Sequence, residues 1–139
     1  MTKTAICAAV GAVGGCVASL FGGWDGGMVT LITCQSIDYV SGLIVAGVFH
    51  KSPKTESGAL ESKAGWKGLC RKAMTLFLVM ISYRIDLMIG TDYIRDAVII
   101  GFTANEVISI VENAGLMGLP MPAALTKAID ILTKKADQE

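Results

Sequence analysis

Apolar residues form four long runs along the chain, separated by short polar segments. The first run, 4–24, contains no charged residue, and a helix of about 20 residues is enough to cross the roughly 30 Å hydrocarbon core of a bilayer. The later runs, 28–49, 73–90 and 97–118, have suitable lengths but contain ionisable residues. The pattern predicts four transmembrane helices, of which only the first satisfies a strict charge-free criterion.

The composition agrees with this pattern. Hydrophobic residues make up 53% of the chain and charged residues 17%, below the roughly 25% that is typical of soluble domains. We therefore predict an all-α fold, a single integral membrane bundle over 1–139. The 12 basic and 12 acidic residues cancel, so net charge gives no reason to expect a nucleic-acid partner.

The distribution of the charges predicts the topology. The loop 50–72 holds six basic residues against two acidic ones, Lys3 precedes the first run, and three lysines follow the last. The other two connections carry one arginine and three aspartates. Because basic loops stay in the cytoplasm, both termini and the central loop are predicted to be cytoplasmic.

The N-terminal run has a second interpretation, a cleaved leader, because Val13-Gly14-Gly15-Cys16 is similar to a lipoprotein cleavage site. We expect the run to be retained as a span. Small residues recur within it at every fourth position, at Gly11, Gly15, Ser19 and Gly23. Such a ridge lets helix backbones approach closely in lipid. It can serve packing within the chain, self-association of several copies, or both.

Five ionisable residues lie inside the predicted spans: Asp38, Arg84, Asp86, Glu106 and Glu112. Such residues usually face a partner or a water-filled cavity. We predict that Arg84 pairs with Asp38 or with Glu106. One base cannot neutralise all four acids, so structural pairing and lining of an aqueous path both stay open. Asn105 and Ser109 are four residues apart and extend the polar face near Glu106.

No catalytic constellation is recognisable. The only histidine is His50, so a His-based triad or a multi-histidine metal site is excluded. The four cysteines fit no zinc spacing, and no phosphate-binding loop is present. We expect no catalytic residues, no metal, no cofactor and no enzymatic activity.

Two segments point to the membrane surface. The end of the central loop is basic, with Lys63, Lys67, Arg71 and Lys72; this cluster suits an anionic lipid surface, or only sets the topology. The tail, 122–139, has the pattern of a short amphipathic helix. It is expected to lie on the membrane or to pack on another subunit.

Four blocks of sequence resemble one known family. Asp38-Tyr39-Val40-Ser41-Gly42 is similar to the DY-[IV]-[TS]-G signature of the toxin secretion/phage lysis holin family, with Asp38, Tyr39 and Gly42 as its most characteristic residues. The segments SKAGWKGLCRKA (62–73), NEVISIVEN (105–113) and GLPMP (118–122) resemble its other motifs, in the same order. Together they span about three-fifths of the chain.

The resemblance implies a multi-pass protein of the bacterial cytoplasmic membrane, usually prophage-encoded. Such proteins form homo-oligomeric lesions that release a murein hydrolase (endolysin), and some assist the release of a toxin. Asp38 would then change from a paired, closed arrangement to a water-facing, open one. Two alternatives from other classes are a small ion- or proton-coupled transporter that uses the same acids, and a membrane adaptor that docks a soluble partner.

Overall fold

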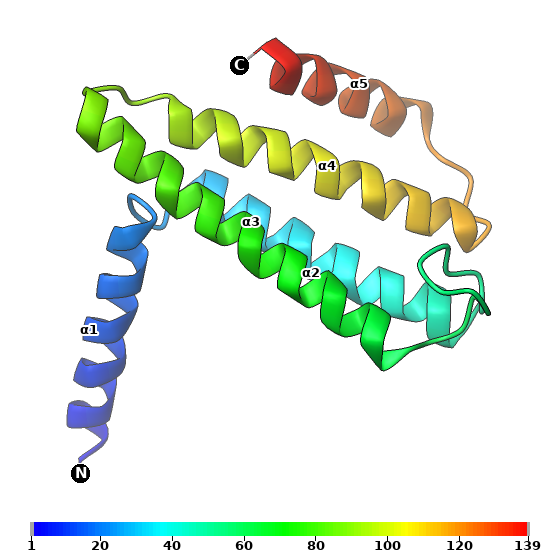
Figure 1. The fold of residues 1–139 in the computed structure, drawn as a ribbon, viewed down its shortest axis with the longest axis horizontal. Helices are drawn as coiled ribbons and strands as arrows, with labels where there is room; N and C mark the ends of the chain where they lie inside the picture. The colour runs from blue at the N-terminus through cyan, green and yellow to red at the C-terminus, as the bar shows by residue number, and fades with distance from the viewer. Residues whose placement is uncertain (1, 139) are drawn as a thin grey trace.

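A computed structural model describes residues 2–138, and in this range the chain is entirely helical (Figure 1). The predicted all-α fold is confirmed. The helices are α1 (Lys3–Leu20), α2 (Gly26–Gly47), α3 (Ser62–Ile89), α4 (Ile94–Leu116) and α5 (Ala123–Gln138). The predicted tail 122–139 corresponds to α5, and Glu139 lies outside the described residues.

Helix α1 points away from the rest of the molecule (Figure 1). The Thr2 hydroxyl accepts a hydrogen bond from the Ala5 amide and begins the helix, as an N-cap residue does. The helix ends at Leu20, because Gly22 (φ +80°) and Gly23 (φ +104°) adopt left-handed backbone conformations. The first predicted span therefore ends four residues early. Gly23 lies in the following turn and is not part of the helical ridge.

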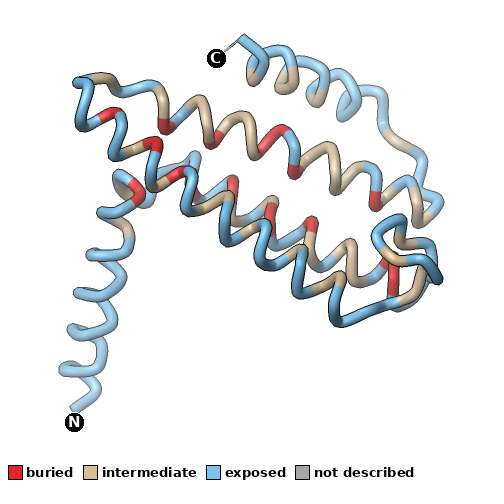
Figure 2. Tube along the Cα trace, in the orientation of Figure 1, coloured by how far each residue is buried: buried red, intermediate tan, exposed pale blue. Residues whose placement is uncertain are grey.

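Helices α2, α3 and α4 form a bundle, and α4 contacts α2, α3 and α5. The Asp25 carboxylate caps α2 by accepting a hydrogen bond from the Met28 amide. Near this end of the bundle a small apolar core is buried, with Phe21, Met28, Leu31, Val79 and Ile99 at its centre. Figure 2 shows buried residues on α2, α3 and α4, whereas α1 contains none.

Helix α3 is longer than the predicted span 73–90, because it begins at Ser62. The second half of the predicted loop 50–72 is thus the first three turns of a continuous helix. No proline follows Pro53 in this loop, and Gly65 and Gly68 weaken a helix without stopping it. The helix ends at Gly90 (φ +74°), whose amide donates to the Asp86 carbonyl. At 28 residues, α3 is about 42 Å long at 1.5 Å per residue.

Helix α5 follows Pro120 and Pro122 and runs back along α4 (Figure 1). Its partly buried residues include Ile129, Leu132 and Ala136, which share one face at helical spacing. The sequence predicted contact with lipid or with another subunit. In the structure α5 packs on α4 of its own chain.

Within residues 2–138, two helices are long and apolar enough to cross a membrane, Lys3–Leu20 and Gly26–Gly47. The most apolar stretch of the first has no buried residues, and that of the second is 28% buried. Helices α3 and α4 carry more ionisable residues, and their crossing of the membrane stays a prediction.

Candidate functional site

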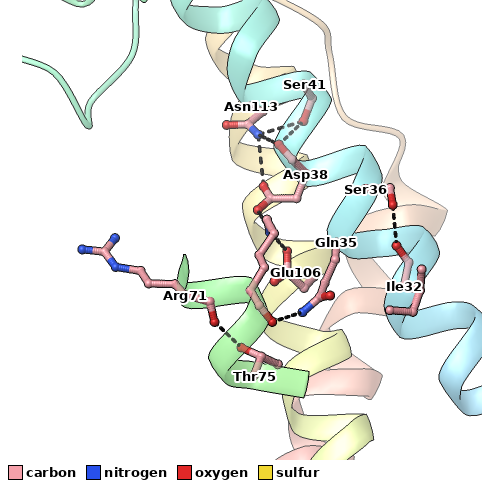
Figure 3. Close-up of polar contacts among 10 residues, drawn as sticks. Ile32, Gln35, Ser36, Asp38, Ser41, Arg71, Thr75, Glu106 and Asn113 are labelled. Carbon is pink, nitrogen blue, oxygen red and sulfur yellow. Dashed lines mark hydrogen bonds and ion pairs between the residues drawn. The ribbon is translucent and has the colours of Figure 1, made fainter. Parts of the chain in front are cut away.

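A buried ion cluster joins α2, α3 and α4 (Figure 3). The Lys72 ammonium group lies 2.7 Å from Asp38 Oδ2 and 2.7 Å from Glu106 Oε2, and it donates a hydrogen bond to each. The side chains of Lys72, Asp38 and Glu106 are 14%, 7% and 9% exposed. One residue from each of three helices therefore meets in the interior.

Neutral polar side chains complete this cluster. The Asn113 amide nitrogen lies 3.2 Å from Asp38 Oδ1 and 2.8 Å from Ser41 Oγ, as a donor to both. Gln35 donates to the backbone carbonyl of Lys72 at 3.4 Å. Both carboxylate oxygens of Asp38 are thus hydrogen-bonded, which explains why an aspartate is tolerated within an apolar run.

The predicted pairing of Arg84 with Asp38 or Glu106 is wrong. Helices α2 and α3 are antiparallel (Figure 1), and Asp38 lies nine residues before the end of α2. Lys72 lies ten residues after the start of α3 and so reaches the same level. Arg84 is about 18 Å further along α3 at 1.5 Å per residue, and it is exposed.

The remaining predicted polar residues are not brought together in one site. Asn105 is exposed but lines the cavity described below with Ser109, whereas Glu112 is exposed and does not. Asp86 is buried at the opposite end of the bundle. Among the basic residues predicted for the loop, Lys63, Lys67 and Arg71 are exposed on α3, and only Lys72 turns inward.

A cavity of about 250 Å³ lies directly beside the ion cluster. Its wall contains all three charged side chains of the cluster, and Asn105, Ser109 and Asn113 of α4. The loop between α2 and α3 also lines the cavity, with residues such as Ser52, Thr55 and Leu60. Asp38 and Glu106 are therefore paired, and both also line a cavity. Their lining of an aqueous path stays a prediction.

The contact with Tyr39 explains why α3 has glycine at positions 65 and 68. Its hydroxyl donates to the Gly65 carbonyl at 3.4 Å. A Cβ atom built on Gly65 would lie 3.4 Å from the Tyr39 hydroxyl oxygen, and one on Gly68 would lie 3.9 Å from its ring. A Cβ atom built on Gly42 would likewise lie 3.8 Å from the side-chain amide nitrogen of Asn113. The Asp38-Tyr39-Gly42 motif therefore packs α2 against both α3 and α4.

A second polar cluster, which the sequence did not predict, lies at the other end of the bundle around Arg95. This buried guanidinium group donates to the Asp25 carboxylate at 2.8 and 3.2 Å, to Asp96 at 3.0 Å, and to the carbonyl groups of Phe21 and Gly23. The Arg95 hydrogen bond lowers the pKa of Asp25, against the opposite effect of partial burial.

Asp86 belongs to this end as a helix cap. Its carboxylate accepts hydrogen bonds from the amides of Ile94 and Arg95, at 3.1 and 2.9 Å, and from the Thr91 hydroxyl. In the sequence, the Arg95 cluster is indicated only by the position of Arg95 between Asp92 and Asp96, just before an apolar run. Taken alone, those charges predict only the topology.

In the described residues, 2–138, the ridge of small residues on α1 faces no other helix. Apart from the neighbouring backbone of α1 itself, no described atom lies within 4 Å of a Cβ atom built on Gly11 or Gly15. The Ser19 hydroxyl donates to the Cys16 carbonyl of the same helix at 2.7 Å. Packing of this ridge against the chain's own spans, one of the two alternatives, does not occur in the structure. As to metals, no group of three or more His, Cys, Asp or Glu side chains in residues 2–138 is placed to hold one.

These features define a class: a small helical membrane protein with a free apolar helix and a bundle held by buried ion clusters. The chain belongs to the bacteriophage holin family, whose model matches residues 15–134. Protein Lin0175 of Listeria innocua is 40% identical over 114 residues, which cover 81% of this chain and 76% of that protein.

More distant relatives extend the comparison. A 14.9 kDa protein encoded in the nagH 3′ region of Clostridium perfringens is 30% identical, covering 84% of this chain and 83% of that protein. A probable holin of Bacillus phage phi105 is 26% identical, covering 78% of this chain and 76% of that protein. No solved structure matches the chain.

Proposed function

We propose that this protein is a pore-forming holin of the bacterial cytoplasmic membrane. It crosses the membrane four times, with both termini in the cytoplasm, and assembles into homo-oligomers. Above a critical number of copies the oligomers permeabilise the membrane and release a murein hydrolase or a toxin. The protein acts through assembly and catalyses no reaction.

One observation carries this proposal, namely helix α1. It is an 18-residue helix without a buried residue, and its glycine ridge has no neighbour in its own chain. Lipid tails can cover the apolar side chains of α1. A ridge of small residues, in contrast, favours close contact with another helix, because it lets the two backbones approach. Helix α1 of a second copy fits this ridge. Membership of the holin family supports an assembly that permeabilises the membrane.

The ion clusters allow α3 and α4 to serve as further spans. Charged residues inside a bilayer are tolerated when they pair within the bundle, and Asp38, Lys72 and Glu106 do so. Arg84 and Glu112 are exposed but lie near the ends of α3 and α4, where long side chains can reach the interface. The basic start of α3 then lies in the cytoplasm.

The same clusters suggest how the pore is lined. Gln35, Asp38, Glu106 and Asn113 are polar and buried between the helices of one closed bundle. Separation of α2 from α4 in an oligomer turns these groups toward water, so that a polar lumen forms without new charges entering lipid.

The test is induced expression in a bacterium with and without a co-expressed cytoplasmic murein hydrolase. We expect an abrupt loss of membrane potential, followed by lysis only where the hydrolase is present. Gradual growth inhibition with an intact potential would contradict the proposal. Ion-dependent flux without hydrolase release would instead identify a transporter.

A further inference from the structure

The ion cluster contains two carboxyl groups but a single base. Lys72 is 2.7 Å from an oxygen of Asp38 and 2.7 Å from an oxygen of Glu106, so the two carboxyl groups lie within two hydrogen-bond lengths of each other. With both carboxyl groups ionised, the cluster carries one uncompensated negative charge. Both side chains are more than nine-tenths buried, which makes that charge unfavourable.

In the described part of the chain, no other charged group pairs with Asp38 or Glu106 to remove this excess. Arg71 of α3 and Lys54 and Glu61 of the loop line the adjacent cavity but are exposed to solvent. On α2, the titratable neighbours are the thiol of Cys34, which lies close to Glu106, and the phenol of Tyr39, which lines the cavity and donates to the Gly65 carbonyl. The groups that α4 contributes to the cavity beside Glu106 are neutral, namely Asn105, Ser109 and Asn113. Among the described residues, the salt bridges of Asp38 and Glu106 come from Lys72 alone.

The two carboxyl groups differ in their hydrogen bonds. Asp38 uses both oxygens, one toward Lys72 and one toward Asn113. Glu106 uses Oε2 toward Lys72, and in the part of the chain that the structure describes Oε1 makes no hydrogen bond. Because Glu106 lines the 250 Å³ cavity, a proton can reach Oε1 from water and bind there without breaking any contact of the cluster.

We propose that Asp38, Lys72 and Glu106 form a binding site for one proton, carried by Glu106 and shared with Asp38, which holds α2, α3 and α4 together. Two neighbouring carboxyl groups cannot both ionise at low cost, and they take up protons as a pair. With one proton bound, the cluster is neutral. Loss of the proton leaves a net negative charge and repels α2 from α4.

The direction of the effect follows from this balance. The bound proton stabilises the closed bundle most at acidic pH, where the carboxyl groups of the unfolded chain are protonated as well. This stabilisation decreases as the pH rises and disappears once the proton has left. The site is a property of the single bundle and does not depend on the pore-forming role. If the protein failed to cause lysis in cells, the proton site could still be tested on the purified full-length protein.

The first experiment is infrared spectroscopy of the detergent-solubilised protein over a pH series. We expect the carbonyl stretch of a protonated carboxyl group at neutral pH, and its loss under alkaline conditions. Asp38→Asn and Glu106→Gln should each abolish the neutral-pH band, because either leaves one carboxylate for Lys72. Glu112→Gln, a change at an exposed acid of the same helix as Glu106, is the matched control and should retain it.

The second experiment measures thermal unfolding of the same proteins. The wild-type midpoint should fall as the pH rises above neutral, whereas Glu106→Gln, which imitates the protonated form, should keep its midpoint over that range. Absence of the carboxylic acid band in the wild-type protein at neutral pH would overturn the proposal. So would a band that persists in both cluster variants. If a cluster variant does not fold, the wild-type titration and the Glu112→Gln control still decide.

Discussion

At the scale of single residues, Lys72 has the largest predicted effect on stability. Replacing it by methionine leaves Asp38 and Glu106 buried beside each other without a base. Removal of one partner from a buried ion pair typically costs about 3–5 kcal/mol, so Lys72→Met should lower the free energy of unfolding by an amount of that order. Thermal or denaturant unfolding in detergent is the measurement.

Arg84 provides the control for this change, since it is a basic residue of the same helix that is exposed and makes no ion pair in the described structure. Arg84→Met should change stability by no more than about 0.5 kcal/mol. Combining Lys72→Met with Asp38→Asn and Glu106→Gln removes all three ionisable groups of the cluster and should recover part of the loss. Equal effects of the two methionine variants would show that Lys72 does not hold the bundle.

Asp25 gives a second residue-scale prediction, on acid stability. Its hydrogen bond with Arg95 holds the pKa of Asp25 below the ordinary value of 3.8. This contribution to stability is complete above that ordinary value and is lost as the pH falls through the lowered one. Because the Asp25 side chain is 51% exposed, the effect is modest.

Asp25→Asn should therefore remove the acid-dependent part of this interaction while retaining an N-cap residue for α2. The unfolding midpoint of the variant, followed from neutral to acidic pH, should start lower and fall less steeply than that of the wild-type protein. Asp92→Asn changes an exposed acid of the α3–α4 turn and should leave the profile unchanged. A wild-type slope in Asp25→Asn would contradict this account.

At the scale of helices, the packing of the start of α3 on α2 depends on Tyr39 lying over Gly65 and Gly68. A methyl group on Gly65 makes an ordinary contact with the Tyr39 hydroxyl group at 3.4 Å. Gly65→Ala should therefore be tolerated, and the gain in helix propensity is up to about 1 kcal/mol. Gly65→Leu must displace the tyrosine and should cost about 1–3 kcal/mol.

Gly115 of α4 is a matched control, because it is helical and exposed and a Cβ atom added to it would meet no atom within 4 Å. Gly115→Leu should lack the steric cost of Gly65→Leu. Unfolding midpoints of the wild-type protein and the three variants, measured in one detergent, separate steric displacement from helix propensity. If Gly65→Leu is as stable as Gly65→Ala, Tyr39 does not set the distance between the helices.

The helices also show what the sequence could predict. Apolar runs are long and continuous, so the existence of α1, α2 and α4 followed from length alone. The start of α3 did not, because a basic, glycine-containing segment is compatible with either a loop or a helix. Because the helix was predicted to begin at residue 73, Lys72 was assigned to a loop. Arg84 was then the one base within the predicted spans that could pair with Asp38. Arg95 was missed because its contacts join turns that are distant in sequence.

At the scale of the whole molecule, α4 is central and α1 stands apart. The bundle of α2, α3 and α4 pairs its buried charges internally, and α5 covers another side of α4. Helix α1 takes no part in this, since none of its residues is buried. The molecule thus combines a closed bundle with a free apolar helix, and the proposed assembly depends on that helix.

Changes at Gly11 and Gly15 of α1 test whether this helix serves assembly and not the stability of the bundle. Neither Gly11 nor Gly15 contacts another helix within residues 2–138, so the double change Gly11→Leu with Gly15→Leu should leave the unfolding midpoint of the bundle nearly unchanged. It adds bulk where backbones of two copies are proposed to meet. The oligomer in mild detergent should become smaller, and lysis after induction should be delayed or lost.

The control is Val13→Leu with Val17→Leu, which adds bulk to exposed positions of α1 on the face opposite the two glycines. It should change neither oligomer size nor lysis timing. Light scattering of the purified proteins and the optical density of induced cultures are the two measurements. Wild-type oligomer size and lysis timing in the glycine variant would show that the ridge is not an interface between copies. Equal defects in both variants would assign the effect to the bulk of α1 in lipid and not to the ridge.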